Sequence, residues 1–433
     1  MFSTSDVVSV TKSAIAQLTA SHSMGIADVT LNELSDDVIV DLGEKLNIED
    51  GEVTNNSPAD IFFKALMSQC GKVVIDTRAY VAQLPKLYVD PINWGLFSEM
   101  VTIELSDLMI DEMWNPEGFI NYGTMSSDNP LIDLGLEEGK RIAGIEFATY
   151  KPPVSAKLYK KAHGIMSAIT IAREQMFTAF RSASEYSSFV AGLFNSVTNA
   201  IQLKAEVYAL MTVSMGIARA TALGNEINLF AEYKTLFPDS TITVDTALQD
   251  ADFLKYALMR IAETKDNIKR FTTAYNNHEH LTFASDTNTI LLNKFSNAVK
   301  FNVRANTYHE ELLGIGDYDK VSTWQAVFGD VDTPYLFDTA SSICLSNTAI
   351  AEAVSGLEPA PTLPEVLTGV IGVVYDRFAM GITIDKKKTT SQYSASKDTV
   401  NYFYHALANY VVNDNYPIVT FVIRDTDDDN LGE

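Results

Sequence analysis

QMFTAFRSASEYSSFVAGLFNSVTNAIQLKAEVYALMTVSM, residues 175–215, decides the fold because its pattern predicts one long amphipathic helix. Ser182 and Glu185 have the spacing of a capping box, in which the hydroxyl accepts a free helix N–H and the carboxylate bonds back to the serine N–H. Apolar residues then recur at three- and four-residue steps, as on one buried helix face. The residues of this expected face are Tyr186, Phe189, Val190, Leu193, Phe194, Val197, Ile201, Ala205, Tyr208 and Met211.

The expected helix, about residues 183–213, is unusually long. At 1.5 Å per residue it makes a rod of roughly 45 Å, whereas the mean globular helix has about 11 to 12 residues. An ordinary core helix would account for the periodicity alone. The length favours a structural spine, whose role is mechanical before it is chemical.

Composition and charge limit the possible partners. The 433 residues are 46% hydrophobic, which allows a large core and indicates two or three domains. The net charge of -24, from 56 acidic and 32 basic residues, argues against a nucleic-acid binder, because phosphate contacts require clustered Lys and Arg. Cys70 and Cys344 are far apart in the sequence, so we expect two buried thiols and assembly in a reducing cytosol.

No membrane association is expected either. The sequence has no apolar run near the roughly 18 residues of a membrane span. Its first residues, MFSTSDVVSVTKSAIAQL, read as an amphipathic helix without the basic and apolar regions of a secretion signal. We therefore predict no membrane partner and no secretion by that route.

The first third of the chain is strongly acidic. Residues 1–60 hold 11 acidic side chains and two lysines, and we expect an arm of short helices there, followed by a helix over residues 59–68 and a strand over residues 72–75. Residues 87–139 contain 11 acids and no Lys, Arg or His. Strand-like residues 99–110 and 142–149 flank turn sequences in this region, which predicts an extended loop rather than a compact unit.

The rest of the chain mixes helices and strands. We expect a helical stretch over residues 158–176 leading into the spine, and a turn at Gly224 and Asn225. Further helices are predicted over residues 228–236, 251–270 and 295–313, and strands over residues 241–244, 287–292, 324–328, 341–345, 369–375, 378–384, 402–412 and 418–423. Because the strands cluster late instead of alternating with helices, the predicted class is α+β.

None of the candidate chemical sites has the spacing that its chemistry needs. An acidic group could suggest a metal site, but a solvated acidic face is favoured because no ligand spacing repeats. Two nearby histidines lack the i, i+4 zinc spacing and favour an exposed loop. Alternate aspartates near the end imitate a calcium loop without its glycine and closing glutamate. These candidates are Asp111, Glu112, Glu117 and Asp128; His278 and His280; and Asp425, Asp427 and Asp429.

The sequence therefore predicts no catalytic, cofactor-binding or metal-ligating residue. It has no phosphate-binding glycine loop, no nucleophile elbow and no metal signature. Two small basic patches, at residues 157–161 and 386–388, are solvated surface or pair with acidic segments of a neighbouring copy.

Three stretches are informative together: GKVVIDTRAYVAQLPKL at residues 71–87, TAFRSASEYSSFVAGLFNSVTNAIQLKAEVYAL within the spine region, and the aromatic-rich run over residues 373–423. They resemble the major capsid proteins of tailed phages, which have the Hong Kong ninety-seven type fold, and are most similar to the short-tailed Bacillus-phage capsid family. The order of arm, loop, spine helix and strand-rich closing part resembles that family as well.

The resemblance implies a domain plan: an arm over residues 1–60 that reaches under a neighbour and an extended loop over residues 85–149 that lies across the adjacent copy. A peripheral domain over residues 61–84 and 150–240 would hold the spine. An axial domain over residues 241–433 would return some late strands to the peripheral domain.

The resemblance also implies a role. We expect a structural protein that self-assembles into hexamers and pentamers of an icosahedral shell around double-stranded DNA, which it encloses without sequence-specific binding. Portal and scaffold or minor capsid proteins are the other expected partners. The protein would be assembled in the host bacterial cytoplasm and would end in the virion.

Two alternatives stay open from the sequence. One is an encapsulin-like compartment shell, and the other is an uncharacterised cytosolic enzyme, which would need converging acids that a sequence cannot display. Some relatives crosslink their shells through a lysine in the extended loop. Because residues 87–139 contain no lysine, we expect noncovalent assembly.

Overall fold

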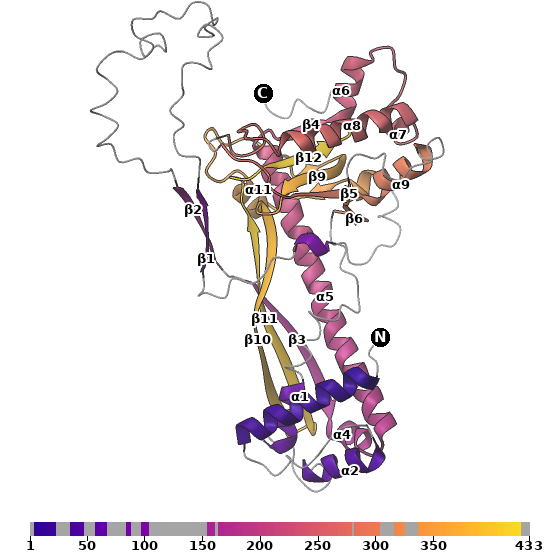
Figure 1. The fold of residues 1–433 in the computed structure, drawn as a ribbon, viewed down its shortest axis with the longest axis vertical. Coiled ribbons are helices and arrows are strands. Elements are labelled where there is room, and N and C mark those ends of the chain that lie inside the picture. The colour runs from indigo at the N-terminus through magenta and orange to yellow at the C-terminus, as the bar shows by residue number, and fades with distance from the viewer. Residues whose placement is uncertain are drawn as a thin grey trace, which may run out of the picture.

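The structure is a computed structural model that describes residues 4–22, 35–46, 57–66, 84–87, 97–103, 154–160, 163–278, 281–303, 316–324 and 337–425. Its central element is α5 (Ala183–Ala222), a single helix of 40 residues. The helix runs from one end of the molecule to the other, with a group of helices at its start and a sheet-rich domain at its end (Figure 1). It is longer than the sequence pattern predicted and continues beyond residue 213.

A three-stranded antiparallel sheet accompanies α5 along its length (Figure 1). Its strands are β3 (His163–Ala172), β10 (Met380–Ser394) and β11 (Thr399–Val412), in the order β10-β11-β3. Strand β11 pairs with β3 from Thr399↔Ala172 to Ala408↔His163, so a segment near residue 400 is joined to one just before the spine.

The first core lies around the beginning of α5. It is built from α1 (Thr4–His22), α2 (Asp36–Lys45), a helix over residues 58–66 and α4 (Arg173–Ala179), together with β3 and β11. Helix α1 contributes buried residues at helical spacing: Val7, Val10, Ala14 and Ile15. The described part of the acidic arm therefore packs on its own chain.

The second core surrounds a five-stranded mixed sheet of order β4-β12-β9-β5-β6. These strands are β4 (Glu226–Asn228), β12 (Ile418–Val422), β9 (Val370–Asp376), β5 (Thr287–Leu292) and β6 (Asp319–Val321). All residues of β9 and β12 are buried, as expected for inner strands covered on both faces. The accompanying helices are α6 (Leu229–Leu236), α7 (Val244–Ala247), α8 (Ala251–Asn267), α9 (Asn293–Asn302), α10 (Phe337–Ala340) and α11 (Asn347–Ala353), and a small sheet pairs β7 (Ile343–Cys344) with β8 (Val366–Leu367).

A two-stranded hairpin forms a separate sheet. Strand β1 (Phe97–Ile103) pairs antiparallel with β2 (Val154–Lys160), from Phe97↔Lys160 to Ile103↔Val154. Shortly before it in the sequence, η2 (Pro85–Leu87) sits against the second core, where Leu84 and Leu87 are buried. Figure 1 shows the hairpin beside the sheet-rich domain. Leu84 and Leu87 therefore contact the sheet-rich domain.

Most of the predicted later elements are confirmed. Helices α6 and α8 start at Leu229 and Ala251, and strands β5, β9, β11 and β12 lie within one to three residues of their predicted bounds. The turn after the spine contains Gly224 with a positive φ of 75°, a conformation that glycine adopts without a steric penalty.

The predicted helix over residues 158–176 is wrong. That segment forms the end of β2, all of β3 and only the start of α4. Ser167 and Ile171 of β3 are buried and Gly164, Met166 and Thr170 exposed, which is the two-residue alternation of a strand. The backbone of β11 supplies its pairing partner, so tertiary hydrogen bonding decides the outcome over a weak helical spacing.

The predicted strand over residues 241–244 is also wrong. Thr243 precedes the short helix α7, and its N–H donates to the hydroxyl of Thr246 at 2.9 Å. Such local hydroxyl bonds favour a helix start over a strand ladder. The predicted strand over residues 324–328 begins in a bend at Trp324, and the nearby strand β6 was not predicted.

Some predictions fall outside the described residues. These are the strands over residues 72–75 and 142–149, residues 325–328 of the strand over residues 324–328, the later part of the helix over residues 295–313, all four residues of the acidic group, and His280. The acidic tail beyond Asp425 is likewise not described.

Two glycines with positive φ give a matched test of the second core. Gly369 (φ 70°) lies where an added Cβ would overlap the carbonyl oxygen of Ile423, whereas Gly356 (φ 77°) faces open space. We predict that Gly369→Ala lowers the free energy of unfolding by more than about 3 kcal/mol, since clash adds to backbone strain.

Gly356→Ala carries the strain alone and should cost about 1–2 kcal/mol. Chemical denaturation of the unassembled subunit, followed by circular dichroism, compares the two. Equal losses would show that the contact between Gly369 and Ile423 is not constrained.

Candidate assembly site

The N-terminus of α5 is capped from two sides. The hydroxyl of Ser182 accepts a hydrogen bond from the Glu185 N–H at 3.2 Å, as the sequence pattern predicted. Glu185 is exposed, and no bond from its carboxylate back to Ser182 is present among the described residues. Instead, the carboxylate of Asp36 on α2 accepts from the Ala183 N–H at 2.8 Å. Two free helix N–H groups are thus satisfied, and the acidic partner also suits the positive end of the helix dipole.

The first half of α5 carries most of the predicted apolar face into the first core. Phe194 and Val190 are fully buried there, whereas Phe189 is only partly buried and packs its ring 6.2 Å from that of Phe63. The other predicted residues that are buried in this core are Tyr186, Leu193, Val197 and Ile201; Ala205 is buried as well. The first core therefore encloses the face that the periodicity indicated.

Tyr186 links the spine to the N-terminal helix. Its ring is fully buried, 5.1 Å from that of Phe180, and its hydroxyl lies 3.1 Å from the hydroxyl of Thr11 on α1. Burial raises the pKa of Tyr186 well above its ordinary value, although the Thr11 hydrogen bond opposes this shift. The phenol therefore stays neutral and serves as a buried anchor for α1.

The second half of α5 enters the other core with a different set of residues. Ala209, Leu210, Val213, Ile217, Ala218 and Ala220 are buried there. Tyr208 is partly buried and contacts both cores, but Met211, expected on the buried face, is 58% exposed. The face rotates because a straight helix drifts by roughly 20° per heptad relative to a strict seven-residue repeat.

Arg219 fastens the end of α5 to two other segments. Its Nε and Nη2 donate to Oδ2 of Asp414 at 2.8 and 2.6 Å, and its Nη1 donates to the carbonyl oxygens of Ala353 and Ser355 at 2.7 and 2.8 Å. The exposed fractions of the Arg219 and Asp414 side chains are 14% and 4%. The guanidinium thereby joins the spine to the β11–β12 turn and to the end of α11, where a cation also suits the carbonyl end of the helix.

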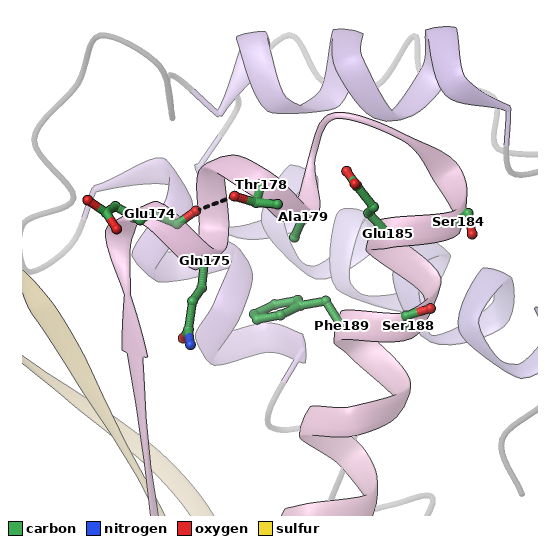
Figure 2. A pocket seen from close by; sticks show the side chains of 8 residues that line it. All are labelled: Glu174, Gln175, Thr178, Ala179, Ser184, Glu185, Ser188 and Phe189. Atoms are coloured by element: carbon green, nitrogen blue, oxygen red, sulfur yellow. Dashed lines mark hydrogen bonds between the residues drawn. The ribbon is translucent and has the colours of Figure 1, made fainter.

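Two grooves border the spine. One, of about 570 Å³, lies between α4 and the first turns of α5, where the Phe189 ring points from α5 towards α4 (Figure 2). Its lining residues are Glu174, Gln175, Thr178, Ala179, Ser184, Glu185, Ser188 and Phe189. No histidine or lysine is among these lining residues.

The second groove, also about 570 Å³, runs along the middle of α5 and is mainly apolar. It is lined by Tyr208, Met211, Met215, Trp324, Cys344 and Tyr410, among others. Cys344 is free and exposed, which corrects the expectation of a buried thiol. Both grooves offer shape and apolar contact along the spine.

The metal and histidine candidates that the sequence analysis disfavoured can be checked in part. In the described ranges, no group of three or more His, Cys, Asp or Glu residues is placed to hold a metal ion. His278 lies in an exposed turn with φ 63°, and its ring nitrogens lie 2.8 and 3.1 Å from the carbonyl oxygens of Thr273 and Leu223. His278 therefore holds its loop to the end of the spine.

A comparison with models of protein families identifies the family of this chain. The model described as Phi29-like phage major capsid protein matches residues 40–422. The chain belongs to this family. This capsid protein is therefore a structural subunit that self-assembles into a phage shell, which favours the shell interpretation over an encapsulin-like compartment or a cytosolic enzyme.

Solved structures of phage proteins are also similar to this chain, at low sequence identity. The capsid structure of Staphylococcus phage Andhra is 12% identical with a TM-score of 0.43, over 80% of this chain and 85% of that one. A structure from Mycobacterium phage Cain is 11% identical with a TM-score of 0.40, over 81% and 94%. The capsid structure of the Cyanophage P-SCSP1u is 11% identical with a TM-score of 0.37, over 79% and 87%. No curated protein matches the chain.

The structure bears on membrane partners as well. Among the described helices, none combines the length and apolarity that crossing a bilayer requires. Helix α5, the longest described helix, instead contributes buried residues to both cores.

The spine can be tested by truncating two aromatic side chains of α5. We predict that Phe194→Ala lowers the free energy of unfolding of the capsid protein by about 3–5 kcal/mol, because it leaves a cavity in the first core. Phe189→Ala is the matched control and should cost about 1–2 kcal/mol, since its ring is only partly buried. Urea unfolding of the subunit measures both losses. A larger loss for Phe189→Ala would contradict the burial described above.

The junction at Arg219 can be tested separately. Arg219→Met removes the cation and leaves the buried Asp414 carboxylate without it, so we predict a loss of about 3–5 kcal/mol in unfolding free energy. Adding Asp414→Asn should recover part of that loss, because the uncompensated charge is then absent. Thermal and urea unfolding of the two single variants and the double variant give the coupling. Strictly additive losses would show that the pair contributes nothing as a pair.

Proposed function

We propose that this capsid protein forms the hexamers and pentamers of an icosahedral shell that encloses double-stranded DNA, with the Hong Kong ninety-seven type arrangement. Portal and scaffold or minor capsid proteins are its proposed partners, and the protein has no enzymatic role. The domain plan is proposed too: an arm over residues 1–60, a loop over residues 85–149, a peripheral domain over residues 61–84 and 150–240, and an axial domain over residues 241–433.

The observation that carries this proposal is the separate β1–β2 hairpin. It pairs into neither of the larger sheets, and the two strands enclose residues 104–153, which are rich in acids. An isolated two-stranded hairpin is only marginally stable by itself in water. In a family of shell subunits, the surface that covers it is a neighbouring copy.

The proposed domain plan supports the roles of the spine residues. Ser182 starts the helix, and the apolar residues of its face hold it against its own chain, so that the loop can adapt to neighbours around a rigid rod. These residues are Tyr186, Phe189, Val190, Leu193, Phe194, Val197, Ile201 and Tyr208. The negative charge of -24 supports a wall that repels packaged DNA rather than adsorbing it.

Negative-stain microscopy of the purified protein tests the proposal. We predict closed shells, rings of subunits or tubes, and a single band at the subunit mass of 47.7 kDa on denaturing gels of assembled particles. The single band follows because residues 87–139 have no lysine for crosslinking.

The control is the same preparation in a denaturing concentration of urea, which should contain no particles. A uniform monomer at all concentrations and salt conditions would contradict shell assembly. A ladder of covalent oligomers would contradict noncovalent assembly only.

A further inference from the structure

An exposed aromatic pair stands at one end of α8. Phe271 and Phe283 are 52% and 44% exposed, and their ring centroids are 4.7 Å apart. They flank the bridge between Thr272 and Thr282, which holds the two sides of their loop together. Exposed phenylalanines in contact with each other mark an interaction site more often than single scattered ones do.

Hydrogen bonds hold the loop that carries this pair to residues 414–415. The amide Nδ2 of Asn276 donates to the Thr282 hydroxyl at 2.9 Å, and that hydroxyl donates to the Asn415 carbonyl oxygen at 3.0 Å. The Asn277 N–H donates to the Asp414 carbonyl oxygen at 2.9 Å. Because the loop is held by buried bonds, little ordering entropy is lost when a partner binds the aromatic pair.

Cations flank the same pair. Lys269 and Arg270 directly precede Phe271 and are exposed, and Arg377, also exposed, bonds through its N–H to the Asp286 carbonyl oxygen. Asp266 forms an ion pair with Lys269, and Asp286 is exposed nearby, so not every charge here is positive. We name Lys269, Arg270, Phe271, Phe283 and Arg377 the basic aromatic pole.

At the other end of α8, exposed apolar side chains lie among acidic residues. Leu236 and Phe237, at the end of α6, are 60% and 51% exposed. The Tyr233 ring lies 4.8 Å from that of Phe237 and 5.4 Å from that of Phe253, which places this surface at the start of α8.

Residues 235–254 carry four acids and no Lys, Arg or His, and Lys234 directly before them donates to the Ser240 carbonyl oxygen at 2.6 Å, so acids outnumber cations here. Lys255 forms an ion pair with Asp252 nearby. We name Leu236, Phe237, Asp239, Asp245 and Asp252 the acidic apolar pole.

The two poles lie at or beyond opposite ends of helix α8. Helix α8 has 17 residues, so its ends lie roughly 25 Å apart at 1.5 Å per residue. Figure 1 shows α6 and α7 together at one end of the sheet-rich domain. Poles at opposite ends of a strut cannot meet within one chain, but they can meet between two chains.

We propose that the basic aromatic pole of one copy binds the acidic apolar pole of a second copy, head to tail. The inference rests on the proposed shell function and names the contact between sheet-rich domains. Because the two surfaces differ, the contact is heterologous, and repeating it closes a ring when the rotation between successive copies divides a full turn. Apolar rings supply the centre of such a contact, and the flanking charges set its orientation and its association rate.

Charge reversal tests the contact. In Arg270→Glu/Arg377→Glu, acids of one copy face acids of the next, and this costs enough to raise the concentration for half-assembly at least tenfold. Asp239→Lys/Asp245→Lys should raise it similarly. The quadruple variant that combines both pairs restores opposite charges. Its concentration for half-assembly should lie within about threefold of the wild-type value.

The matched control is Arg270→Lys/Arg377→Lys, which keeps both charges and should assemble like wild type. Analytical ultracentrifugation measures the assembled fraction, and circular dichroism melting confirms that each variant is folded. Equal assembly of wild type and both reversed variants, or additive losses in the combined variant, would overturn the contact. Absence of particles from the wild-type chain would instead contradict the proposed function.

A disulfide provides a second readout that does not depend on charge. In a Cys70→Ser/Cys344→Ser background, Phe237→Cys combined with Phe283→Cys should give reducible oligomers on oxidation, since a disulfide needs Cβ atoms about 3.5–4.5 Å apart. Each single replacement should give no oligomer longer than a dimer. A doubly substituted protein that assembles but stays monomeric on non-reducing gels would refute the head-to-tail pairing.

Discussion

Helix α5 depends on the burial of both of its halves, each in a different core. A helix of 40 residues measures roughly 60 Å, and helices in proteins draw most of their stability from tertiary packing rather than from propensity. Phe194 lies in one core and Ile217 in the other, so the rod is held at both halves. Asp36 caps its first turn and Arg219 ties down its last, and between them Tyr208 contacts both cores.

The sheet beside the spine has the same dependence. Strand β11 pairs with β3 over ten residues, and β3 leads through α4 into α5, so sheet and helix are joined at their first-core ends. At the other end, Arg219 binds Asp414 in the turn that follows β11. The helix and the sheet are therefore fixed to each other at two distant points, and such a frame resists bending better than either part alone.

Local pattern was enough to predict some of this architecture and insufficient for the rest. Ser182 and the apolar spacing after it identify the start of α5 because a cap and a helix face are local features. The second half of α5 extends beyond the predicted helix. Its contacts are made through small residues such as Ala218, which give weak periodicity. Local spacing predicts a helix where strand β3 forms. The strand depends on a pairing partner that lies more than 200 residues away, which the local pattern does not contain. Neither the Asp36 cap nor the Arg219 junction has any local signal, since each joins segments more than 100 residues apart.

A chain with a net charge of -24 must still associate with its own copies. At physiological ionic strength, charges further apart than about 8 Å are screened, so general repulsion is weak and local charge patterns decide where copies meet. Helix α8 favours Asp250 and Asp252 near its start and Lys269 just after its end, because each sign suits the dipole at that end. The same distribution leaves opposite charges at opposite ends of α8. A preference that stabilises one helix can thereby orient one subunit against the next.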